Sequence, residues 1–181
     1  MINKIKSMIL NLCEGHDWPW KEHIEAVVHY SKLLAEKTGA DEEIVEVAAW
    51  LHDITKIKTG EKNHEVSSSE EAGKILEGFG YPADKIKKVK RCILAHPSDK
   101  EPAPETKEEK ILFAADGLSH FDMFLAHARS SFVQRNLSVD EARERLIKKY
   151  GKFWRKVNIM PEAAEIAKPK YNAIKLILGE D

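Results

Sequence analysis

Apolar residues recur at helical spacing along most of this chain, and no segment alternates at the period of two that marks a half-buried strand. Capping residues, glycines and prolines divide the pattern into helices. We expect helices at residues 2–13, 17–38, 42–53, 67–80, 82–96, 107–118, 119–132, 138–157 and from 161 onwards, with Pro169 kinking or dividing the last one. The spacing therefore predicts an all-α fold, a compact bundle of helices.

Side chains suited to cap helices support several of these boundaries. Asp17 is the expected N-cap of the second helix, and the spacing of a capping box occurs at Ser67–Glu70 and at Ser138–Glu141. The polar residues 56–66 are expected to form a loop before Ser67, and the proline-rich residues 97–107 a second loop. This second loop is too short to serve as a linker between domains.

Length and composition narrow the class of protein. The 181 residues, 43% of them apolar, suit a single domain at 1–181, in which the C-terminal helices pack on the preceding part. A formal net charge of -1 provides no basic field for nucleic acid or a membrane surface, and no apolar run reaches the length of a membrane span. The N-terminal segment lacks the apolar run of a signal peptide and the two cysteines are isolated, so we expect a cytoplasmic protein with reduced thiols.

Two acidic residues stand in segments that should be buried. In "AAWLHDITK", residues 48–56, His52 and Asp53 end an apolar run, and "KILFAADGL", residues 110–118, surrounds Asp116 with apolar side chains. A helix that is apolar nearly all round is usually buried, and an unpaired carboxylate there is destabilising by several kcal/mol. A lone inward aspartate is more often a cap or half of an ion pair, and a position near a helix end suits Asp116 because Gly117 follows it.

Helical phase separates the histidines into an inward and an outward class. His23 falls on the apolar stripe of its helix, His29 falls on the polar face, and His96 extends the apolar stripe of residues 82–96. A single inward histidine is more often a core residue bonded to backbone than a ligand. The sequence nevertheless has three inward histidines and two inward acids, and no inward lysine or arginine is evident. This combination favours a bound divalent cation, which would neutralise the acids and take the imidazoles as ligands.

The order His23, then His52–Asp53, then Asp116 resembles the H…HD…D signature of the HD-domain superfamily of metal-dependent phosphohydrolases. His52 follows His23 by 29 residues, Asp116 follows Asp53 by 63 residues, and both gaps suit that family. The resemblance covers about residues 17–120 and includes the words "EHIEAVVHYSKLLAEKTGA" and "SSSEEAGKILEGFGYP". It implies an all-α phosphohydrolase fold with a divalent metal in the helical core, held by the four signature residues.

Some branches of the superfamily carry two more histidines and bind a second metal, and His64 and His96 fall where these would lie. In that arrangement Asp53 would bridge the two metals. His64 stands in the expected loop, where a plain solvated histidine is an equal alternative. The family often has the motif HDIGK, and in this chain Thr55 takes the place of the glycine. This difference could alter the loop that follows His52 and Asp53. The three letters Gly80-Tyr81-Pro82 occur in the chain, but by themselves they do not support a cyclic-dinucleotide assignment.

The chemistry expected of such a site is hydrolysis of a phosphate ester, with nucleotides as candidate substrates, by a hydroxide that one or two metals make available at neutral pH. Asp53 and Lys56 are the residues expected to serve catalysis, Asp53 as a shared ligand and Lys56 as a contact to a phosphate, although Lys56 is equally consistent with an ordinary surface lysine. Mixed histidine and aspartate ligands suit Mn, Fe, Ni, Co, Zn or Mg. The partner expected is a small phosphorylated substrate.

Two other classes of function remain open from the sequence. Six His/Asp ligands also permit a non-haem di-iron oxygenase on the same scaffold, and a non-catalytic module that binds metal or nucleotide is the other alternative. Nucleic-acid binding through the basic residues 85–91 is disfavoured, because the net charge is -1 and aromatic residues are not interleaved there.

Overall fold

The computed structural model describes residues 1–98 and 100–179. Residue 99, which falls in the expected proline-rich loop, and residues 180–181, at the end of the expected domain, lie outside the described residues. Within the described ranges the regular structure is helical and contains no strand, so the predicted all-α fold is confirmed.

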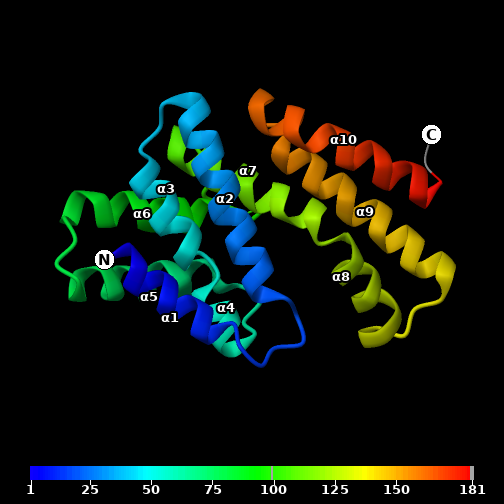
Figure 1. Ribbon diagram of the computed structural model, residues 1–181, viewed down its shortest axis with the longest axis horizontal. Helices are drawn as coiled ribbons and strands as arrows, with labels where there is room; N and C mark the ends of the chain where they lie inside the picture. The colour runs from blue at the N-terminus through cyan, green and yellow to red at the C-terminus, as the bar shows by residue number, and fades with distance from the viewer. Residues whose placement is uncertain (99, 180–181) are drawn as a thin grey trace.

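The helices follow the chain in the order shown in Figure 1: α1 (Ile2–Leu12), α2 (Trp20–Thr38), α3 (Glu42–Leu51), α4 (Ile54–Thr59), α5 (His64–Gly78), α6 (Ala83–Ala95), α7 (Lys107–Asp122), α8 (Phe124–Arg129), the π-helix η1 (Ser130–Gln134), α9 (Val139–Val157) and α10 (Pro161–Leu178).

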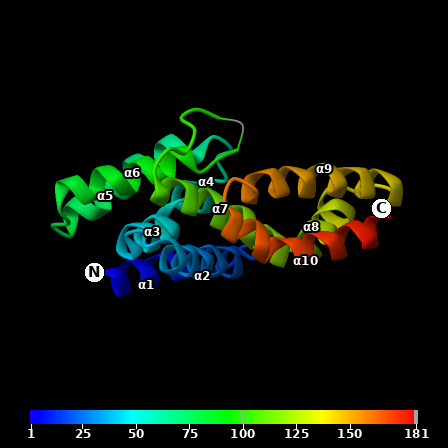
Figure 2. The same cartoon turned by 90° about the horizontal axis from the view of Figure 1, so that it is seen from above.

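Helix α7 is the central element of the arrangement. It packs against α2, α3 and α6 on one side and against α9 and α10 on the other. Figure 2 shows α1 to α6 gathered at the N-terminal end of the molecule, and α8, α9 and α10 extending from α7 towards the other end. Buried apolar residues from both groups of helices join in one core. Among the described residues, no helix combines the length and the apolar character needed to cross a bilayer.

Local sequence explains most helix boundaries. The Asp41 side chain accepts a hydrogen bond from the backbone N–H of Ile44 at 3.2 Å and so caps α3. Gly39 ends α2 in the left-handed conformation, with φ of 65°, which glycine adopts without a steric penalty. The predicted capping box of Ser138 and Glu141 opens α9 and is confirmed.

Three expectations near the N-terminal half were wrong. Helix α2 begins at Trp20 with Pro19 as its N-cap, so Asp17 is not the cap. Residues 56–66 are not one loop, because Ile54 and Ile57, one turn apart, are both buried and hold the short helix α4 in place. Helix α5 begins at residue 64, and Ser67 therefore lies inside it rather than capping it.

The second half also departs from expectation. Asp116 lies inside α7 rather than near a helix end, because α7 continues to Asp122. The helix expected at 119–132 is instead the end of α7, the six-residue α8 and the π-helix η1. Pro169 lies within α10 without dividing it.

Candidate metal centre

The six residues predicted to bind metal lie together in the interior, and we call them the His/Asp cluster. They come from six helices or helix ends: α2, the C-cap of α3, the N-cap of α4, the first residue of α5, the C-cap of α6 and the middle of α7. Each is less than one tenth exposed. The members are His23, His52, Asp53, His64, His96 and Asp116.

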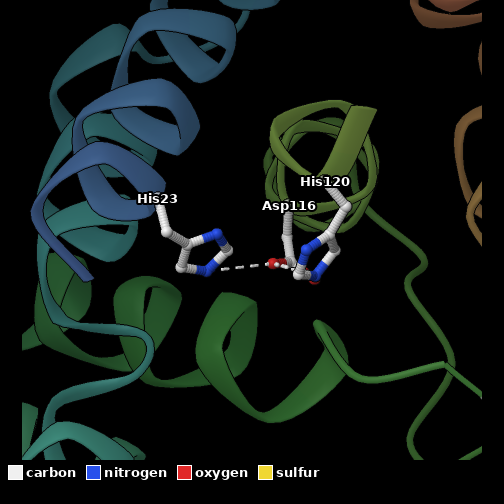
Figure 3. Close-up of side chains that lie close together, drawn as sticks. All are labelled: His23, Asp116 and His120. Atoms are coloured by element: carbon white, nitrogen blue, oxygen red, sulfur yellow. Dashed lines mark ion pairs between the residues drawn. The ribbon is translucent and has the colours of Figure 1, made fainter. Parts of the chain in front are cut away.

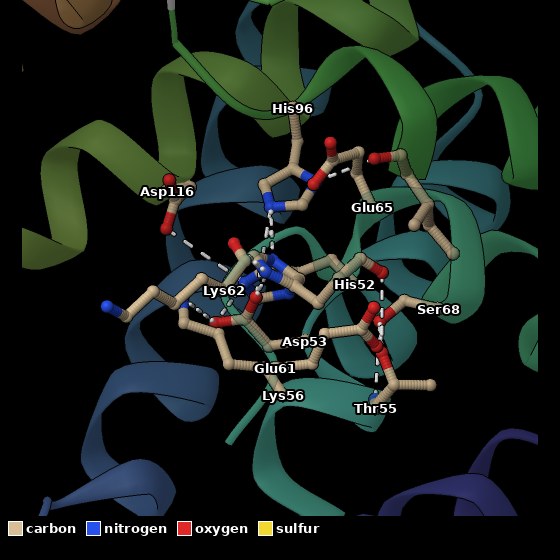
Figure 4. Close-up of polar contacts among 12 residues, drawn as sticks. His52, Asp53, Thr55, Lys56, Glu61, Lys62, Glu65, Ser68, His96 and Asp116 are labelled. Atoms are coloured by element: carbon tan, nitrogen blue, oxygen red, sulfur yellow. Dashed lines mark hydrogen bonds and ion pairs between the residues drawn. The ribbon is translucent and has the colours of Figure 1, made fainter. Parts of the chain in front are cut away.

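Asp53 lies at the middle of the His/Asp cluster (Figure 4). Its Oδ2 atom is 3.5 Å from His23 Nε2 and 3.6 Å from His52 Nε2. Its Oδ1 atom is 2.5 Å from His64 Nε2 and 3.8 Å from His96 Nε2. Asp53 thus presents one carboxylate oxygen to each of two pairs of imidazoles, which is the arrangement expected of a bridging ligand. His64, expected in a loop, is buried in this second pair.

Asp116 lies between the rings of His23 and His120 (Figure 3). Its Oδ1 atom is 3.5 Å from His23 Nε2 and 3.9 Å from His52 Nε2. The same oxygen is 3.6 Å from Nε2 of His120, one helical turn further along α7. Two carboxylate oxygens and several imidazole nitrogens therefore converge on the space between α2, α3 and α7.

Hydrogen bonds fix which ring nitrogen of three histidines faces the cluster. The Nδ1 atoms of His52 and His96 lie 2.8 Å and 2.6 Å from the carbonyl oxygens of Ala49 and Ile93, which can only accept, so these nitrogens carry the proton. Ser119 Oγ donates to the Asp116 carbonyl at 2.8 Å and accepts from Nδ1 of His23 at 3.0 Å, with the same result.

The unprotonated Nε2 atom of His52 consequently directs its lone pair towards Asp53 Oδ2, and Nε2 of His96 lies 3.3 Å from Nε2 of His64 and 3.8 Å from Asp53 Oδ1. His52 Nε2 has no hydrogen-bond partner, and neither does Asp53 Oδ1, whose contact with His64 lacks hydrogen-bond geometry. Burial lowers the pKa of His52 to about 4 and that of His96 well below its usual range, so neither ring supplies a proton at neutral pH. Lone pairs facing anionic oxygens repel one another unless a cation lies between them, and the residues present therefore fit a divalent metal.

Lys56 lies at the solvent-facing edge of the cluster. Its Nζ atom is 3.1 Å from Asp53 Oδ2 and 5.3 Å from the centre of the Trp20 ring, and its side chain is 36% exposed. Burial alone would raise the pKa of Asp53, but Lys56 and then His52 outweigh burial and hold that pKa well below its ordinary value. Asp53 is therefore ionised at neutral pH, as a metal ligand must be.

The sequence predicted no inward lysine near the two acids, and this was wrong. Lys156 of α9 is 4% exposed, forms an ion pair with Asp116 Oδ2 and donates a hydrogen bond to the His96 carbonyl at 2.6 Å. Gly117 permits this close approach, because a Cβ atom there would lie 2.9 Å from Val157 Cγ1. Asp116 is thus half neutralised by the protein itself, and its Oδ1 atom remains directed at the cluster.

His120 is the second residue that the sequence reasoning missed. Its ring stacks on His23 at a centroid distance of 5.0 Å and on Phe153 at 4.1 Å. Asp116, His120 and His23 offer ligand atoms that all lie within 4.8 Å of one another. The spacing of four residues between Asp116 and His120 could have identified His120, because it puts both residues on one face of a helix. The helix was, however, expected to end at residue 118, before His120.

Thr55, at the position where the family often has glycine, ties the start of α5 to the cluster. Its hydroxyl lies 2.9 Å from Ser67 Oγ and 2.8 Å from Ser68 Oγ, and its backbone N–H donates to Ser68 Oγ at 3.2 Å. It also donates to the carbonyl of His64 at 3.3 Å. Thr55, in place of the glycine of the family motif, therefore helps to hold His64 against Asp53.

Comparison with known families agrees with this geometry. Residues 20–120, more than half of the chain, match the model of the HD domain, and the match contains all six members of the His/Asp cluster. The chain belongs to the HD-domain family. An uncharacterized protein of Clostridium beijerinckii is 34% identical to this chain over 102 residues, which are 54% of the present chain and 62% of that protein. The chain spans 32% of the length of a second curated relative, so it covers less than two thirds of either.

Solved structures share the fold over nearly the whole chain. The YpgQ protein of Bacillus subtilis, in a complex with ADP, has a TM-score of 0.76 and 22% identity, covering 98% of this chain and 91% of its own. The predicted HD superfamily hydrolase of an uncultured Thermotogales bacterium has a TM-score of 0.66 and 21% identity, covering 98% and 88%. These likenesses show that α8 to α10, beyond the family match, belong to the shared fold.

Proposed function

We propose that the protein is a metal-dependent phosphohydrolase that cleaves a phosphate ester at the His/Asp cluster. The observation that carries this proposal is the position of Asp53 between two pairs of imidazoles, each directing Nε2 at one of its oxygens. Two groups of three donors share this residue: His23, His52 and Asp53, and Asp53, His64 and His96. The arrangement supports one metal in each group, with Asp53 common to both.

A divalent metal bound there supplies water of lowered pKa and positive charge to stabilise the oxygens of a phosphoryl group. The chain's own contribution is to orient the ligands and to bind the substrate. The carbonyl groups of Ala49 and Ile93 hold the rings of His52 and His96 with Nε2 inward. Lys56, at the exposed edge, is placed to donate hydrogen bonds to phosphate oxygens that approach from solvent.

Nucleotides are the first substrates to test. The Bacillus subtilis protein that shares this fold was solved with ADP, and the HD domain has a lysine and the Trp20 ring at the edge of its cluster. A cation beside an aromatic face suits a ligand that carries both phosphate and a flat ring. We therefore propose nucleoside phosphates as the substrate class, with a mononucleotide as the simplest member.

The test is release of inorganic phosphate from a panel of nucleoside phosphates by the full chain, before and after chelation. We expect release to stop with chelator and to return when Mn, Co, Ni, Zn, Fe or Mg is restored. Lys56→Ala should retain its metal and lose turnover on the charged substrate, with a much smaller loss on a neutral carboxylic ester. Absence of phosphate release from every substrate by a chain with verified metal would refute the proposal, and oxygen consumption by the iron-loaded chain would favour the oxygenase alternative.

A further inference from the structure

A row of side chains runs along one face of α9, away from the His/Asp cluster. Arg145, Lys149, Phe153 and Lys156 are spaced by four, four and three residues, which places them one above another on a helix. Lys156 is the inner end of the row because it pairs with Asp116. Lys149 stands about 10 Å further along the helix axis, at the helical rise of each residue. Figure 1 shows α9 leading from beside α7 towards the far end of the molecule.

Stacked rings connect Lys149 to the cluster. The Lys149 ammonium lies 5.1 Å from the centre of the Phe153 ring, and Phe153 stacks on His120 at 4.1 Å. His120 in turn is 3.6 Å from Asp116. The rings of Phe153 and His120 therefore lie between the Lys149 ammonium group and Asp116 of the cluster.

Lys149 is a partly buried cation without an acidic partner in the described part of the chain. Burial, followed by the charges of Arg145, Lys56 and Arg135, lowers the pKa of Lys149 to about 8, with Asp116 acting in the opposite direction. Arg145 is held in place by a hydrogen bond to Ser131 Oγ at 2.8 Å. Several positive charges gathered in one half-buried region destabilise a fold, and such arrangements are typical of places that bind an anion.

We propose that Lys149 and Arg145 form a subsite for an anionic group of the substrate other than the phosphoryl group at the His/Asp cluster. The subsite rests on the proposed function for its reaction, but its residues lie outside the segment matched by the HD model. Arginine and lysine together suit a phosphate, the first as a planar fork and the second as a point charge. The helical rise of about 10 Å between Lys156, which pairs with Asp116, and Lys149 suits a second phosphate carried on a chain or on the far side of a sugar.

The subsite can be tested by binding measurements that do not require turnover. Binding of AMP, ADP and ATP, which differ in the number of phosphates, is measured calorimetrically on the full chain after chelation. Lys149→Met, which keeps an unbranched apolar stem but removes the charge, should weaken ATP binding about tenfold or more, as expected for a charged hydrogen bond. The same variant should weaken AMP binding by less than about threefold, and Lys149→Arg should restore most of the ATP affinity.

Lys148→Met is the matched control, because Lys148 is the exposed neighbour on α9 and loses the same charge. It should leave all three affinities within about twofold of wild type. Equal losses for AMP and ATP in Lys149→Met, an equal loss in the control, or no ATP binding to the wild-type chain would each overturn the subsite. Failure of metal-dependent phosphate release, with the ATP preference of Lys149 intact, would instead refute the proposed reaction and leave a binding subsite.

Discussion

Lys156 and Asp116 form a buried ion pair beside the His/Asp cluster, from helices α9 and α7. The pair joins the C-terminal helices to the part of the chain that carries the HD signature. It also gives Asp116 a partner for Oδ2 while leaving Oδ1 directed at His23. A structural ion pair and a candidate ligand thus share one carboxylate.

Removing the lysine should be strongly destabilising, and metal should reduce the effect. Lys156→Met leaves Asp116 as an uncompensated buried charge, which costs about 3–5 kcal/mol in the free energy of unfolding. A metal beside Asp116 supplies positive charge in place of the ammonium, so the difference from wild type should narrow when metal is added. Urea unfolding of both chains, with metal and with chelator, measures this. A difference that is unchanged by metal would place the metal away from Asp116.

Metal count distinguishes a two-metal from a one-metal centre. His64 and His96 belong only to the second group of donors, so the loaded wild-type chain should hold two metals and His64→Ala should approach one. Elemental analysis after dialysis gives both values. One metal per wild-type chain under saturating conditions would confine the site to His23, His52, Asp53 and Asp116.

The pH dependence of the protein's stability should reveal the lowered pKa of Lys149. Its pKa is lowered from 10.5 to about 8, so the folded chain disfavours the charged form. Below pH 8 both folded and unfolded chains carry the proton and the destabilisation is fully present; between about 8 and 10.5 the unfolded chain binds more protons, so stability rises with pH at this position.

Lys149→Met should therefore raise the melting temperature most below pH 8, and its advantage should fade as pH rises towards 10.5. Thermal unfolding of wild type and Lys149→Met in a series of buffers measures the trend, with Lys148→Met as the control. A gain that is constant across this pH range, or a loss of stability at neutral pH, would show that Lys149 is not held as an uncompensated cation.

Helical spacing and the family resemblance together predicted the six members of the His/Asp cluster. Helical spacing puts His23 and His96 on inward faces, and apolar surroundings bury Asp53 and Asp116 whatever the detailed packing. The ligand role of these residues stays a prediction. His29 faces solvent, as its position on the polar side of α2 predicted.

Features that depend on packing between helices far apart in the chain could not be predicted from the sequence. Lys156 lies on a helix rich in basic residues, and periodicity does not say which of them an acid on another helix will draw inward. The six-residue α4 is too short to show a period, so residues 56–66 looked like a loop and the burial of His64 was hidden. His120 was missed because Gly117, taken as a helix end, instead provides room for α9.

The most direct test of the account is the metal content of three chains. Wild type, Asp53→Ala and His29→Ala are loaded with the same metal, dialysed and measured by elemental analysis, with circular dichroism to confirm that each is folded. We predict that His29→Ala matches wild type and that Asp53→Ala loses its metal, since Asp53 is common to the two donor groups proposed to hold the metals. A folded Asp53→Ala chain with the full wild-type metal content would contradict the assignment of the His/Asp cluster as a metal centre.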